Sequence, residues 1–203
     1  MGKIKVKKQS TFIDMTAMSD VTVLLLTFFM LTATFLPKEP VQVITPMSVS
    51  ETKIPESNVL TILIDPQGKV FLNIDRPETK KAVLELMGQD YGMTFTPKQI
   101  NAFVEQSHIG APMGKMGGFL DLSLSDQDAE IKKMGVPLDS ANNQFARWVK
   151  HAREIGGDNM GIAIKADQNT PYPLVDDVLK ALVKMKENRY SLVTALRAAP
   201  SNI

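Results

Sequence analysis

The sequence contains no cysteine, which excludes disulfide bonds, thiol catalysis and thiolate metal sites. It has two histidines, His108 and His151, which lie far apart in the chain and belong to no spaced ligand motif. The net charge of +1 gives no indication of a nucleic-acid partner. No nucleophile stands beside a base in any recognisable catalytic pattern. The sequence therefore predicts a protein that is not an enzyme and that uses no metal and no cofactor.

Charge is also missing from one long apolar run, residues 21–36, which begins directly after Asp20. Extended back to Met15, the run reaches roughly 20 residues, about the thickness of the hydrocarbon core of a bilayer. Four lysines precede the run: Lys3, Lys5, Lys7 and Lys8. No such excess of positive charge follows it. This asymmetry predicts a cytoplasmic amino terminus and places the rest of the chain on the far side of the membrane.

A cleaved signal peptide has the same order of lysines followed by an apolar stretch. Two observations argue against that alternative. Asp14 and Asp20 are acids within this segment, and no clear small-residue cleavage site follows. We therefore interpret residues 1–12 as a basic cytoplasmic tail and residues 13–36 as a retained transmembrane helix.

Asp20 is the unfavourable residue of this helix, because a carboxyl group within the hydrocarbon core raises the free energy of membrane insertion. Such a residue is a functional candidate by default. At about 3.6 residues per turn, Thr16, Thr27 and Thr34 fall on the same face as Asp20. Burial favours the neutral form of a carboxyl group, so a buried Asp20 would bind and release protons. We expect Asp20 to translocate protons and the three threonines to serve the proton path or helix packing. Two alternatives stay open: Asp20 as a solvated helix cap, and threonine hydroxyls bonded to the preceding turn.

Residues 37–58 are rich in proline, serine and threonine, a composition typical of an extended linker. On the far side of the membrane this segment would be a periplasmic linker. Within it, Val41, Gln42, Val43 and Ile44 are predicted to add as a strand to the edge of a sheet. A passive spacer is the alternative.

Residues 59–198 have the patterns of one small globular domain. Two apolar segments flank a turn and predict a β-hairpin over residues 59–64 and 70–74. Further helices are predicted over residues 77–87, 142–155 and 171–187, and further strands over residues 161–166 and 190–195.

Residues 91–140 are less regular and are interpreted as a helical insertion into this domain. Thr96 and Gln99 form a capping-box pattern, Ser125 is expected to cap another helix, and residues 110–118 are predicted to be a Gly/Met loop. The resulting order, β-β-α-(helical insertion)-α-β-α-β, predicts a two-layer α+β periplasmic domain behind a single N-terminal transmembrane α-helix.

The segment Phe12-Ile13-Asp14-Met15-Thr16-Ala17-Met18-Ser19-Asp20-Val21 resembles the signature of the ExbD/TolR family, an Asp-x-Thr-Pro-x-x-Asp-Val pattern entering a single span. The resemblance covers residues 10–75, which include the first hairpin, and residues 140–195. The stretch between them is longer than in the commoner forms and is similar to ExbD-like proteins of Bacteroidetes-type bacteria. Ala17 stands where the family usually has proline, so the helix is expected to begin earlier or to lack a bend.

The resemblance implies a proton-channel or stator subunit of a bacterial inner-membrane motor, with Asp20 as the protonatable aspartate. It implies a homodimer of this single-pass chain within a pentamer of an ExbB/TolQ-type multi-span protein in the lipid bilayer. The periplasmic domain would pass work to a TonB- or TolA-type protein for outer-membrane transport. The alternative is a membrane-anchored protein whose periplasmic domain binds peptidoglycan or another envelope component.

Overall fold

The computed structural model describes residues 15–33, 39, 43–48, 57–139, 142–193 and 195–196. The chain divides into two compact units, Met1–Pro37 and Lys38–Ile203. The first unit contains helix α1, Met15–Thr32, whose 18 residues correspond to a length of about 27 Å. None of its residues is buried, and it is long and apolar enough to cross a membrane. The ends of the predicted helix, residues 13–14 and 34–36, lie outside the described residues.

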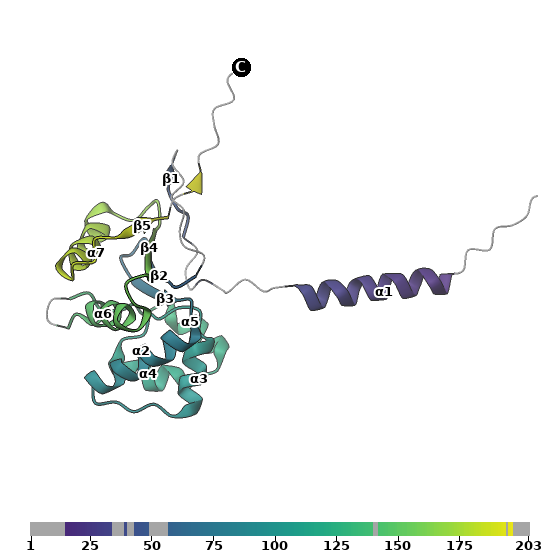
Figure 1. The fold of residues 1–203 in the computed structure, drawn as a ribbon, viewed down its shortest axis with the longest axis horizontal. Coiled ribbons are helices and arrows are strands. Elements are labelled where there is room, and N and C mark those ends of the chain that lie inside the picture. Colours follow the sequence, from purple (N-terminus) through teal and green to yellow (C-terminus); the bar gives the residue numbers. More distant parts are fainter. Residues whose placement is uncertain are drawn as a thin grey trace, which may run out of the picture. The chain divides into compact units, whose positions relative to one another are not determined.

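The second unit is built on a mixed four-stranded sheet with the order β3-β2-β4-β5 (Figure 1). Its strands are β2 (Val59–Ile64), β3 (Val70–Ile74), β4 (Gly161–Ala166) and β5 (Tyr190–Leu192). The hairpin pair β2–β3 is antiparallel, whereas β2–β4 and β4–β5 are parallel. Parallel neighbours require crossover connections, which helices supply here. The unit is therefore a small α/β domain, which corrects the predicted α+β class.

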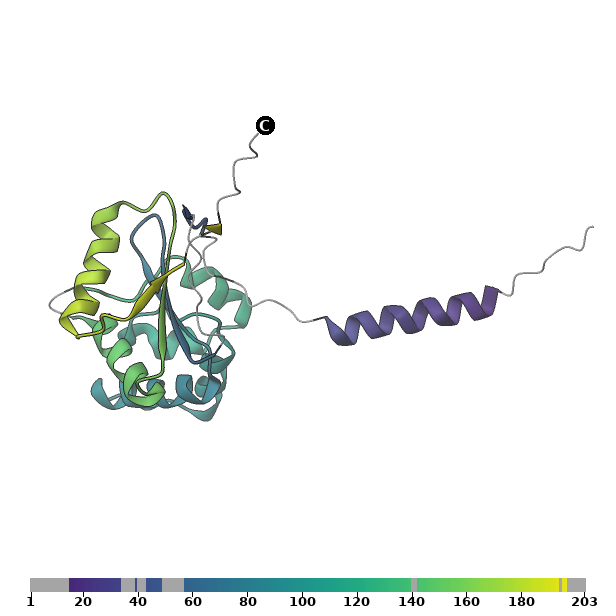
Figure 2. The ribbon, with the colours of Figure 1, turned by 45° about the horizontal axis from the view of Figure 1, so that its top comes forward.

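Six helices are described in this unit: α2 (Pro77–Asp90), α3 (Pro97–Glu105), α4 (Met113–Leu120), α5 (Leu124–Ile131), α6 (Gln144–Gly156) and α7 (Tyr172–Lys184). They follow the strands in the predicted order, with α3, α4 and α5 forming the insertion. Two short strands, β1 (Met47–Ser48) and β6 (Ala195–Leu196), pair in parallel as a separate sheet. Figure 2 shows the same arrangement from a second direction.

The core lies where apolar side chains of the central strands meet the helices. Leu60, Ile62 and Ile64 alternate along β2 and are each at most 1% exposed. Their partners across the sheet include Leu72 and Ile164, which are also buried. The largest buried side chain, Trp148 of α6, stacks on Phe103 of α3 with ring centroids 5.8 Å apart. This stack joins the insertion to the main body of the domain.

Helix α4 corrects the prediction of a Gly/Met loop over residues 110–118. Its glycines disfavour a helix, but Met113, Met116 and Leu120 recur at helical spacing and are buried. Burial of this apolar side outweighs the low helix propensity. Helix α5 likewise begins earlier than predicted, because Ser123 rather than Ser125 caps it and accepts a hydrogen bond from the backbone N–H of Asp126.

The insertion also closes one edge of the sheet. Leu72 of β3 exchanges two backbone hydrogen bonds with Ile109, and the N–H of Val136 donates to the carbonyl of Val70. An open edge strand invites pairing with other chains. Here, Ile109 from the middle of the insertion and Val136 from near its end occupy the outer side of β3 and block such pairing.

A buried lysine ties α2 to the end of α3. The ammonium group of Lys80 donates hydrogen bonds to the carbonyls of Val104 and Gln106, and it lies 5.4 Å from the ring centroid of Phe103. Val104 lies in the last turn of α3 and Gln106 directly follows the helix, where backbone carbonyls lack partners within the helix. Burial lowers the pKa of Lys80 to about 8, because the charged form is poorly solvated there.

Candidate functional site

The α1 helix is the first candidate site because it combines an apolar surface with one carboxylate. Its apolar side chains are at least half exposed, including Leu24 at 60%, Phe28 at 60% and Leu31 at 87%. Leucine and phenylalanine at such exposure are suited to lipid or to apolar protein surface. Asp20 lies in the second turn of this helix. Among the described residues, it forms no ion pair.

The hydroxyl groups of α1 behave differently from the carboxylate. Thr27 donates to the carbonyl of Leu24 at 2.9 Å, and Ser19 donates to the carbonyl of Met15 at 2.8 Å. Such bonds satisfy a hydroxyl within the helix itself. A carboxylate has no proton to donate and gains nothing from these carbonyls. Asp20 is therefore the polar group of this segment that most needs a partner outside the helix.

The predicted polar face is described only in part. Thr16, Asp20 and Thr27 lie on one side of α1, as helical geometry requires, whereas Thr34 lies outside the described residues. The hydroxyl bond of Thr27 fits the alternative in which threonines stabilise the helix. A place for Thr16, Thr27 and Thr34 on a proton path stays a prediction.

The segment that leads into the α/β domain is a second candidate, because it is tied to the domain by its backbone. The N–H of Ile44 donates to the Asp167 carboxylate at 2.9 Å, and the N–H of Gln168 donates to the carbonyl of Ile44 at 2.8 Å. Asp167 also accepts from the N–H of Asn169 at 2.8 Å. The backbone N–H groups of Asn169 and Ile44 hold the pKa of Asp167 below its usual range.

Two further contacts fasten this segment. Glu39 pairs with Lys165 of β4 at 2.5 Å, and β1 pairs with β6 at the carboxy-terminal end of the described residues. Of the predicted strand, Val41 and Gln42 lie outside the described residues, and Val43 and Ile44 lie in no strand. The strand that forms in this segment begins at Met47. Addition of Val41–Ile44 to a partner's sheet stays a prediction.

The contacts of Asp167 were missed from the sequence. An aspartate at a strand end is commonly explained by local hydrogen bonding, and its bond to Asn169 has that origin. Its bond to Ile44 joins positions 123 residues apart and has no signature in the local pattern. Two close features, the Asp-x-Asn turn at 167–169 and Lys165 beside it, were the available hints.

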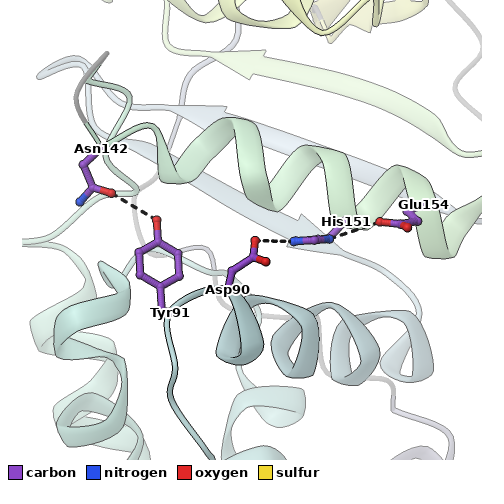
Figure 3. Close-up of polar contacts among 5 residues, drawn as sticks. All are labelled: Asp90, Tyr91, Asn142, His151 and Glu154. Carbon is purple, nitrogen blue, oxygen red and sulfur yellow. Dashed lines mark hydrogen bonds and ion pairs between the residues drawn. The ribbon is translucent and has the colours of Figure 1, made fainter.

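A polar cluster closes the base of the insertion (Figure 3). The Nε2 atom of His151 lies 2.8 Å from the Asp90 carboxylate, and its Nδ1 atom lies 3.4 Å from Glu154. The Tyr91 hydroxyl donates to the side-chain oxygen of Asn142 at 3.2 Å. The hydrogen bond with His151 is the main reason why the pKa of Asp90 is lowered. The two ends of the insertion thus meet at one point.

The geometry of this cluster suits a stabilising role and not a catalytic one. His151 and Asp90 are joined directly, and no hydroxyl group of the described residues is bonded to the imidazole, as a hydrolytic triad would require. The residues that the structure describes contain no group of three or more His, Asp or Glu side chains that could hold a metal ion. The prediction of no enzymatic activity, no cofactor and no metal is left unchanged.

Comparison with known proteins places these features in context. A scan against protein families matches residues 7–196 to the family described as biopolymer transport protein ExbD/TolR. A search of curated proteins and a search of solved structures each found no match. The family match spans both compact units and nearly the whole chain, so the predicted resemblance is confirmed.

Proposed function

The chain belongs to the ExbD/TolR family of biopolymer transport proteins, and from this premise we propose that it is a proton-coupled subunit of an inner-membrane motor. Members of this family are non-enzymatic accessory proteins of transport. In our proposal, the chain works with an ExbB/TolQ-type multi-span protein. Proton flow through Asp20 then energises a TonB- or TolA-type protein. The observation that carries the proposal is the single carboxylate in an exposed apolar helix.

The physical basis is the difference between the two states of a carboxyl group. A charged Asp20 needs a polar partner or water, whereas a neutral Asp20 can pass along apolar surface at low cost. Protonation on one side of the membrane and release on the other would therefore permit movement in one direction only. The proton motive force would bias the two arrangements of the helix, as any ligand with unequal affinity for two states does.

The proposed arrangement has two copies of α1 inside a pentamer of the multi-span partner. The amino-terminal lysines favour a cytoplasmic amino terminus, which would put the α/β domain in the periplasm. Thr16, Thr27 and Thr34 would face the same side as Asp20, toward the partner. The segment from Glu39 to Ser48, held by Asp167 and Lys165, would connect movement of the helix to the domain.

Chemical modification tests this proposal on the purified complex of the chain with its multi-span partner. Dicyclohexylcarbodiimide attacks protonated carboxyl groups in apolar surroundings. We expect mass spectrometry to find one modified carboxyl group in α1, at Asp20, with a yield that falls as the pH of the reaction is raised. Asp177, an exposed aspartate of α7, is the internal control and should stay unmodified.

Two variants make the assignment specific. Asp20→Asn should remove the modification, and Asp177→Asn should leave it unchanged. Modification of Asp20 no faster than that of Asp177 would mean that Asp20 is solvated and ionised. The helix would then be only an anchor, and the proposal would be wrong.

A further inference from the structure

A groove separates helix α6 from the turn that follows α7, residues 185–189. Its volume is about 340 Å³, and its apolar lining consists of the half-buried side chains of Ala146 and Met185 and of Val149, which is only 1% exposed. It adjoins a wider hollow of about 800 Å³ that reaches β5 at Tyr190. Arg153 and Glu187 line both, so the two form one continuous surface, here called the α6–α7 groove.

The partition between the two hollows is rigid. The guanidinium of Arg153 forms a bidentate ion pair with Glu187, with N–O distances of 2.9 and 2.6 Å. It also donates to the carbonyls of Gly157 and Met160. Each of the three guanidinium nitrogens therefore has a partner, and bidentate geometry fixes the orientation of the group. A surface held in this way needs little rearrangement to receive a ligand.

Positive charge is in excess around this groove. Its lining contains five cationic and two anionic residues: Arg147, Lys150, Arg153, Lys186 and Arg189 against Asp158 and Glu187. The ion pair of Arg153 with Glu187 cancels one charge of each sign. Within the described part of the chain, Lys150, Lys186 and Arg189 are exposed and form no ion pair. The groove therefore keeps an apolar wall with an unneutralised basic rim.

The backbone at Lys186 adds an independent observation. Lys186 has a φ of 63°, a left-handed conformation in which glycine is strongly preferred at the end of a helix. The N–H of Glu187 donates to the carbonyl of Leu182, and this bond holds the turn closed. The chain thus keeps a cation on the rim of the groove at a position where glycine would be less strained.

We propose that the α6–α7 groove binds an acidic amphipathic helix of a partner protein. The apolar side of that helix would lie against the half-buried side chains of Ala146 and Met185. Its carboxylates would face Lys150, Lys186 and Arg189. Binding of an amphipathic helix in an apolar groove is a common mode of peptide recognition, and complementary charge sets the choice of partner. This interaction is separate from Asp20 and does not depend on proton transport.

The test uses the full chain in detergent and a synthetic helical peptide with leucine on one face and glutamate on the other. A photoreactive leucine is placed on the apolar face, so that only bound peptide is crosslinked. Mass spectrometry should locate the crosslinks on α6 and at Met185. A peptide of the same pattern with lysine in place of glutamate should crosslink at least about tenfold less, and added salt should weaken crosslinking of the glutamate peptide.

The variants Lys186→Gly and Lys150→Glu separate binding from folding. Lys186→Gly relieves the left-handed strain, so the melting temperature should stay the same or rise while crosslinking falls. The double variant Lys186→Gly/Lys150→Glu should lower the apparent affinity for the glutamate peptide by about tenfold. Lys115→Glu, a charge reversal at an exposed lysine of α4, is the matched control and should change neither property.

Three results would overturn the inference. These are failure of the glutamate peptide to crosslink in the groove, crosslinking no stronger than that of the lysine peptide, and an unchanged affinity in the double variant. Occupancy by a short-chain anionic phospholipid alone, or self-association that the double variant abolishes, would assign the groove to another occupant. Because these outcomes leave carbodiimide modification of Asp20 unaffected, failure here is distinct from failure of the proposed function.

Discussion

Asp20→Asn should reduce energised uptake to the level of cells that lack the gene, with normal amounts of the protein in the membrane. Asparagine has nearly the size and polarity of aspartic acid, but it neither ionises nor carries a proton. The substitution therefore removes proton exchange while it keeps the helix and its packing. Growth on a substrate that requires energised outer-membrane transport, measured beside immunodetection of the chain, checks the result.

Ser19→Ala is the matched control for this experiment. Ser19 is the neighbour of Asp20, and its hydroxyl is satisfied by the carbonyl of Met15 within the helix. Loss of this hydroxyl should leave uptake close to that of the unaltered protein. Uptake that persists in Asp20→Asn, or that falls equally in Ser19→Ala, would mean that the carboxyl group has no special role.

Trp148→Ala should lower the free energy of unfolding of the α/β domain by about 3–5 kcal/mol, the usual cost of truncating a buried large aromatic residue. Trp148 is 1% exposed and stacks on Phe103, so the substitution leaves a cavity between α6 and the insertion. Domains of this size are commonly stable by about 5–15 kcal/mol, so the loss is a large fraction of the total. Trp148 is the only tryptophan, so its replacement removes the tryptophan fluorescence that usually reports unfolding. Circular dichroism during chemical unfolding is therefore the suitable measurement.

Trp148→Phe distinguishes the ring from its polar atom. The Nε1 atom of Trp148 is buried and has no hydrogen-bond partner among the described residues. Phenylalanine keeps an aromatic face against Phe103 and removes that unsatisfied donor. We therefore expect a clearly smaller loss than for Trp148→Ala. Ile155→Ala, at an exposed position of the same helix, should change stability little. Equal losses in all three variants would contradict this account of the core.

The parts of the fold that sequence patterns predicted are those that local chemistry determines. The strand Gly161–Ala166 is bounded by a glycine turn and filled with apolar residues, and the capping box of Thr96 and Gln99 forms as expected. Helix α4 was missed because three of its eight residues are glycines, which have a low helix propensity. The burial of Met113 and Met116 stabilises the helix despite these glycines, and it depends on the rest of the domain.

The candidate sites divide in the same way. Asp20 stands out from the sequence alone, because one charge in a long apolar run is a local contrast. The ties of Ile44 to Asp167 and of Arg153 to Glu187 join residues 123 and 34 positions apart. Patterns in neighbouring residues do not predict contacts between positions so far apart in the sequence. The groove beside α6 exists only because the turn after α7 is brought to that helix by the parallel pairing of β4 with β5.

If Asp20 carries protons, the proton flux through the complex depends on its carboxyl group. The chain and its multi-span partner would be reconstituted in liposomes that contain a pH-sensitive dye, and a membrane potential would be imposed. We expect acidification with the unaltered chain and with Asp177→Asn, and loss of that flux with Asp20→Asn. Equal flux in the Asp20→Asn complex would contradict the claim.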